Sequence, residues 1–156
     1  MGRVWRFLKD HHDQIGSTTA LLGLVVGIGG FALTIQQLQS TAQALRASNT
    51  YQVQKDAREL VDKVRADERF RAAMQAGVLP ENDSAVLENL WKMFNFYVSV
   101  FRQSEADGLS PQFVASFRRD FCAFVQKPLV AQGWDRLRAA DQLGADQEEM
   151  RRRWCP

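Results

Sequence analysis

Histidine side chains supply most general bases and many metal ligands, and this chain has only two of them. His11 and His12 are adjacent, so on a helix they point in different directions, and no third ligand is near them in the sequence. The remaining residues contain no histidine, which excludes a Ser-His-Asp triad or a histidine-ligated metal there. We therefore predict no metal site and no cofactor.

The chain has two cysteines, Cys122 in an aromatic stretch and Cys155 at the penultimate position. There is no CxxC spacing and no cluster of cysteine with histidine, so the pattern predicts neither a zinc site nor a disulfide framework. The expected roles are a buried small apolar side chain at Cys122 and a free thiol at Cys155.

Neighbouring carboxylates are a third possible source of chemistry. Glu105 with Asp107, and Glu148 with Glu149, stand in polar surroundings with nothing near them to make one an acid and the other a base. The glycines of residues 23–30 lie in an apolar stretch and do not follow a strand, so they do not predict a phosphate-binding loop. We predict that the protein is not an enzyme.

The most informative element is the charge-free stretch from Ile15 to Ile35. As a helix it would span about 30 Å, the thickness of a bilayer's hydrocarbon core, so we predict a transmembrane helix over residues 15–37. Small residues fall on one of its faces at alternating spacings of four and three, where two helix backbones can approach closely. This predicted helix-packing interface comprises Gly16, Ala20, Gly23, Gly27, Gly30 and Thr34.

Residues 1–14 form a leader before this helix. Its cations fit a signal peptide, but the apolar stretch is longer than that of a signal peptide and no small-x-small cleavage site follows, which favours a retained anchor. The leader is interpreted as an amphipathic interfacial segment, with Trp5, Arg3 and Arg6 as the interfacial anchor. A frayed polar leader is the alternative.

The rest of the chain is expected to be all-α, because no stretch alternates with the period of a strand. A juxtamembrane helix is predicted over residues 38–66 and a soluble helical domain over residues 67–156. Aromatic residues at helical spacing, ten of them between Trp91 and Trp134, predict a small antiparallel bundle with an aromatic core. The predicted fold is thus one transmembrane helix that continues into this bundle.

The junction from Gln39 to Tyr51 reads QSTAQALRASNTY. With the preceding apolar helix, the stretch Phe94–Phe101, the turn at Gly108 and the stretch ending in Trp134, it resembles an uncharacterised bacterial family. The members are small single-pass membrane proteins with a helical domain of unknown function. The resemblance implies no activity, cofactor or catalytic residue. Members carry basic residues directly after the span, which implies a cytoplasmic domain, whereas this chain has glutamines there.

Which side of the membrane the domain occupies is left open by the charges. Arg3, Arg6 and Lys9 precede the span and Arg46 is the first cation after it, which favours a cytoplasmic N-terminus and a periplasmic domain. The family resemblance and the expectation of unpaired cysteines favour the opposite. The bacterial inner membrane is the expected location, with the domain on the cytoplasmic side.

Together these patterns predict a membrane-anchored helical interaction module. It would be an accessory or assembly subunit of a larger membrane protein complex, and the alternative is a self-associating membrane stress or defence effector. The expected partners are membrane lipid and, through the small-residue face, another transmembrane protein or a second copy. The formal net charge of +2, with acids interleaved among the bases, predicts no binding to nucleic acid.

Overall fold

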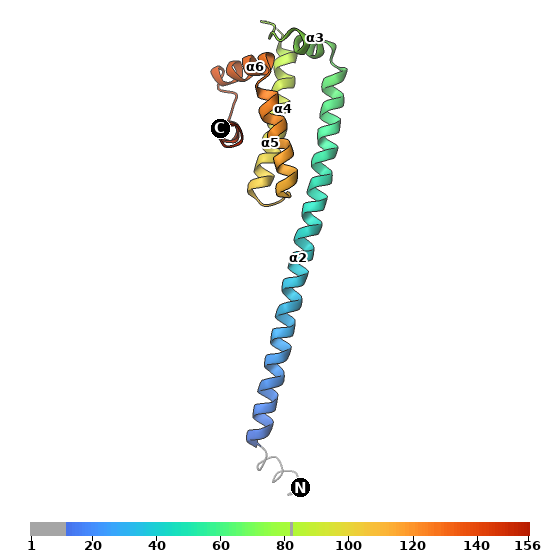
Figure 1. The fold of residues 1–156 in the computed structure, drawn as a ribbon, viewed down its shortest axis with the longest axis vertical. Coiled ribbons are helices and arrows are strands. Elements are labelled where there is room, and N and C mark those ends of the chain that lie inside the picture. Colours follow the sequence, from blue (N-terminus) through green and yellow to red (C-terminus); the bar gives the residue numbers. More distant parts are fainter. Residues whose placement is uncertain (1–11, 82) are drawn as a thin grey trace. The chain divides into compact units, whose positions relative to one another are not determined.

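The computed structural model describes the backbone of residues 12–81 and 83–156, and in the first helix the side chains from residue 23 onward. All regular structure in these ranges is α-helical, as predicted. The helices (Figure 1) are α2 (His12–Ala66), α3 (Glu68–Ala76), α4 (Ser84–Glu105), α5 (Pro111–Val125), α6 (Pro128–Ala139) and α7 (Ala145–Trp154).

The chain divides into two compact units, residues 1–44 and residues 45–156. Within the described part of the chain, no helix contains an apolar stretch long enough to qualify as a membrane span. The first part of the predicted span, residues 15–22, lies outside the described side chains. The transmembrane helix stays a prediction.

The second unit begins with residues 45–66 of α2, which pack against the helical domain. Val53 and Val64 are buried on the inner side of this helix, with Leu60 packed beside them. Val61, which the periodicity also assigns to this inner face, is exposed. The helix continues through Ser48–Tyr51 without a break, and there the hydroxyl of Thr50 donates a hydrogen bond to the Arg46 carbonyl.

Short polar side chains set the beginnings of three helices in this unit. Asp67 accepts hydrogen bonds from the backbone N–H groups at the start of α3, Asp83 does the same at α4, and Ser110 at α5. Pro111 follows Ser110 at the first helical position, where its missing N–H costs nothing. At the other end of α3, Gly77 adopts a left-handed conformation with φ of 68° and closes the helix. These boundaries agree with the capping pattern in the sequence.

The core of the second unit is built around α4, which packs against α3, α5, α6 and α7. Phe94 is fully buried, and its ring centroid is 4.9 Å from that of Trp134 and 6.0 Å from that of Phe124. Phe121 is also fully buried and lies between Trp134 and Trp154. The backbone of α6 approaches α4 at Gly133, where a Cβ atom would collide with the Leu90 side chain. The predicted aromatic core is therefore present in this unit.

The two cysteines are joined in a disulfide between α5 and the residue after α7, with their Cα atoms 5.5 Å apart. The expectations of no disulfide, of a buried small apolar side chain at Cys122 and of a free thiol at Cys155 are therefore wrong. The sequence pattern did not indicate the pair because the cysteines are 33 residues apart. They meet only because α7 folds back and places Trp154 in the aromatic core, next to α5.

Tyr97 has a perturbed titration. Burial, with a smaller contribution from the negative charge of Asp120, raises the pKa of its hydroxyl from 10.0 to about 12. A pKa that is higher in the folded state gives stability that is complete below pH 10 and is lost as the pH rises through about 12. The expected loss is on the order of 2 kcal/mol in the free energy of unfolding.

Urea unfolding of wild type and Tyr97→Phe, below pH 10 and near pH 12, measures this loss. The Tyr97→Phe variant should lose less stability between the two conditions, because phenylalanine does not titrate. Equal losses in the two proteins would show that Tyr97 does not carry the effect. A second comparison, of Tyr51→Phe with Tyr51→Phe/Tyr97→Phe, removes the exposed second tyrosine from both proteins.

Candidate interaction surface

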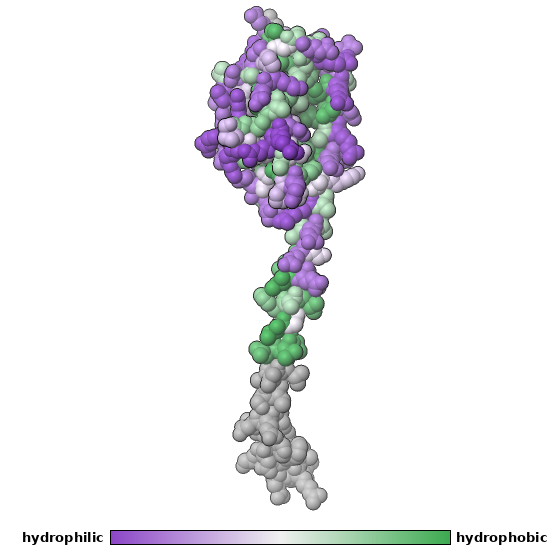
Figure 2. Space-filling model, viewed as in Figure 1, coloured by the Kyte–Doolittle hydropathy of each residue, from purple (hydrophilic) through white to green (hydrophobic). Residues whose placement is uncertain are grey.

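The first unit exposes a continuous apolar segment of α2. Its large side chains are between 41% and 69% exposed, and they are Leu24, Val25, Val26, Ile28, Phe31, Leu33, Ile35 and Leu38. At 100° per residue these positions surround the helix, so the apolar character is not limited to one stripe. Figure 2 shows the hydrophobic colour over the described part of this segment. A helix that is apolar on all sides is typical of a segment surrounded by other apolar groups.

Hydroxyl groups near this segment are satisfied inside the helix. The Thr34 hydroxyl donates to the Gly30 carbonyl at 2.9 Å, and the Thr41 hydroxyl donates to the Gln37 carbonyl at 2.9 Å. A hydroxyl bonded in this way needs no water, so it is compatible with an apolar environment. Between Leu24 and Ile35, where Thr34 is the one polar side chain, the helix therefore presents almost only carbon to its surroundings.

The described part of the predicted helix-packing interface forms an open face. A Cβ atom at Gly23, Gly27 or Gly30 would meet nothing within 4 Å, and Thr34 lies on the same face of the helix. Gly16 and Ala20 lie outside the described side chains, as do Trp5, Arg3 and Arg6 of the predicted interfacial anchor. The structure thus brings together four of the six interface residues.

The junction residues that carry the family resemblance hold the start of the second unit together. Arg46 pairs with the Asp107 carboxylate at 2.5 Å and donates to the Asp107 carbonyl at 3.0 Å. Asn49 donates to the Gly108 carbonyl at 3.1 Å, and a Cβ at Gly108 would lie 3.1 Å from that amide nitrogen. The turn between α4 and α5 is therefore clamped to α2. The sequence motif showed these residues but not their partners.

The carboxylates considered as catalytic candidates are held in surface ion pairs. Glu105 pairs with Arg153 at 2.6 Å, and Glu148 pairs with Arg138 at 2.8 Å.

Asp67 has a pKa below its usual value because the Phe70 backbone N–H, and then Asn89, donate to its carboxylate. Among the described residues, no group of three metal-ligating side chains could hold an ion. His11 lies outside that description.

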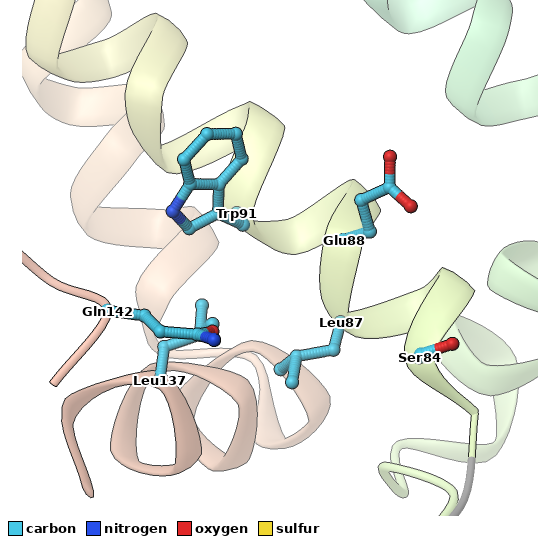
Figure 3. A pocket seen from close by; sticks show the side chains of 6 residues that line it. All are labelled: Ser84, Leu87, Glu88, Trp91, Leu137 and Gln142. Atoms are coloured by element: carbon cyan, nitrogen blue, oxygen red, sulfur yellow. The ribbon is translucent and has the colours of Figure 1, made fainter. Parts of the chain in front are cut away.

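A shallow apolar pocket opens on the second unit beside α4 and α6. It encloses about 540 Å³ and is lined by Ser84, Leu87, Glu88, Trp91, Leu137 and Gln142 (Figure 3). Trp91 is 42% exposed, although its spacing assigns it to the core-facing side of α4. The periodicity identified the apolar face but could not show that no helix of the described ranges covers this part of it. Such a pocket could accept an apolar side chain of a partner.

Comparisons with protein-family models, with curated proteins and with solved structures found no match for this chain. The resemblance of Gln39–Tyr51 to an uncharacterised bacterial membrane family therefore stays a prediction.

Proposed function

We propose that this protein is a membrane-anchored helical interaction module, and that it serves as an accessory or assembly subunit of a larger membrane protein complex. The charge-free segment of α2 would lie in the bilayer of the bacterial inner membrane. There its small-residue face would pack against a transmembrane helix of the partner, while the helical domain contacts a surface outside the lipid.

The observation that carries this proposal is the exposure of the large apolar side chains between Leu24 and Leu38. Moving one such side chain from water to an apolar environment is favourable by about 1.5–3 kcal/mol. For the eight of them, lipid or a partner offers on the order of 10 kcal/mol or more. An exposed apolar surface of this size indicates an interaction site with lipid or protein.

The glycine face favours a helix partner in addition to lipid. Association between helices in lipid depends on close packing, because the hydrophobic effect no longer drives it. The open space over Gly23, Gly27 and Gly30 permits this close approach. Bulky residues on the other faces would meet lipid tails.

Replacing Gly27 with leucine should weaken association in the membrane, because the larger side chain separates the two backbones. We expect a decrease of about tenfold or more, which corresponds to about 1.4 kcal/mol. Val25→Ala is the matched control, since Val25 lies on the opposite face of the helix. An in-membrane association assay compares the two variants. Equal effects would mean that the glycine face is not the contact.

Purification from native membranes in mild detergent tests the kind of partner. A different subunit in constant stoichiometry would support the accessory role. A homogeneous oligomer of this chain alone would contradict it and support the self-associating stress or defence effector. A monomer that stays associated only with lipid would contradict both.

A further inference from the structure

Cys122 and Cys155 lie in a geometry that allows one specific disulfide. They are the only cysteines in the chain, and both are partly buried where the end of α7 meets α5. A Cα–Cα distance of 5.5 Å is in the range that a disulfide requires. The two cysteines are 33 residues apart in the sequence, whereas the cysteines of redox-active CxxC motifs are separated by only two residues. These features are those of a structural disulfide.

Non-covalent contacts place the two sulfur atoms together. Trp154, next to Cys155, is buried, and its ring centroid lies 5.9 Å from that of Phe121 and 5.7 Å from that of Phe101. The guanidinium of Arg118 donates from Nε to the Trp154 carbonyl at 2.8 Å. These contacts hold Cys155 beside Cys122 in the folded domain, in addition to the covalent bond.

We propose that this disulfide is formed on the oxidising side of the membrane, so that the helical domain faces the periplasm and the leader faces the cytoplasm. The inference rests on the membrane anchor of the proposed function. Two thiols lose two protons and two electrons, and a protein disulfide of that compartment accepts them and becomes a dithiol. Structural disulfides persist in such compartments and are rare in the reducing cytoplasm.

The charges around the anchor point to the same orientation. Arg3, Arg6 and Lys9 stand 12, 9 and 6 residues before Ile15, whereas glutamines follow Ile35 and the first cation after it, Arg46, stands 11 residues further on. Positive residues close to a span remain on the cytoplasmic side. With the cysteines paired, the argument from unpaired thiols for a cytoplasmic domain no longer holds.

The lysines provide an internal test of this orientation. Lys9 precedes the anchor, while the other four lie in the second unit and are exposed: Lys55, Lys63, Lys92 and Lys127. Intact spheroplasts that express the full chain are treated with a membrane-impermeant amine reagent, and the modified positions are read by mass spectrometry. We expect modification of the four domain lysines and protection of Lys9 until the membrane is opened.

Two other labelling patterns would overturn the proposal in different ways. Modification of Lys9 with protection of the domain lysines would reverse the orientation and leave the anchor intact. Modification of all five lysines in intact spheroplasts would contradict the anchor itself. Protection of all five lysines until lysis would contradict it as well. In the same cells, a thiol-alkylating reagent added under denaturing conditions should modify the chain only after reduction. Free thiols in most of the protein would refute the disulfide.

Discussion

Phe94→Ala is expected to lower the free energy of unfolding of the helical domain by about 3–5 kcal/mol. The Phe94 ring is completely buried and lies within aromatic contact distance of Trp134 and Phe124. Its removal would leave a cavity that the rigid neighbouring rings on α5 and α6 cannot fill. Because the free energy of unfolding of a small domain is only about 5–15 kcal/mol, this single substitution would remove a large fraction of the domain's stability.

Phe117→Ala is the matched control for this prediction. Phe117 belongs to the same aromatic cluster, with its ring centroid 5.9 Å from that of Phe96, but it is only partly buried. Its loss should cost less, about 1–2 kcal/mol. Chemical unfolding followed by circular dichroism measures both variants. A larger effect for Phe117 than for Phe94 would mean that the partly exposed rings are covered by something outside the domain.

Loss of the disulfide is expected to lower the free energy of unfolding by about 3–4 kcal/mol. The bond closes a segment of 33 residues that includes α6 and α7, and it restricts the unfolded chain accordingly. The Cys122→Ser/Cys155→Ser variant and the reduced wild type should show similar losses. The released end of the chain should also let Trp154 become more accessible to a fluorescence quencher.

The double variant also serves as the control for reductant. Its unfolding midpoint should be the same with and without reductant, whereas that of the wild type should decrease on reduction. A wild-type midpoint that reductant does not change would show that the disulfide contributes nothing to stability.

The helices themselves followed closely from the sequence, because local signals determine them. Ser110 with Pro111 marks the start of α5, and Gly77 in its left-handed conformation marks the end of α3. The three-to-four spacing of apolar residues on α4 correctly indicated Leu90, Phe94 and Val98 as buried.

Features that depend on contacts between distant residues did not follow from the sequence. Trp91 shares the spacing of the core residues, but in the described part of the chain it stays 42% exposed and lines the pocket between α4 and α6. Cys122 and Cys155 lie 33 residues apart, and only the packing of Trp154 brings them together. Arg46 is the first cation after the predicted span, but its pairing with Asp107 depends on where the turn between α4 and α5 lies.

We expect the charge-free stretch from Ile15 to Ile35 to be embedded in lipid. Washing membrane vesicles with alkaline carbonate tests it most directly, because this treatment removes peripheral proteins and leaves integral ones. We expect the full-length chain to stay in the membrane pellet. Recovery of the intact chain in the wash would contradict it.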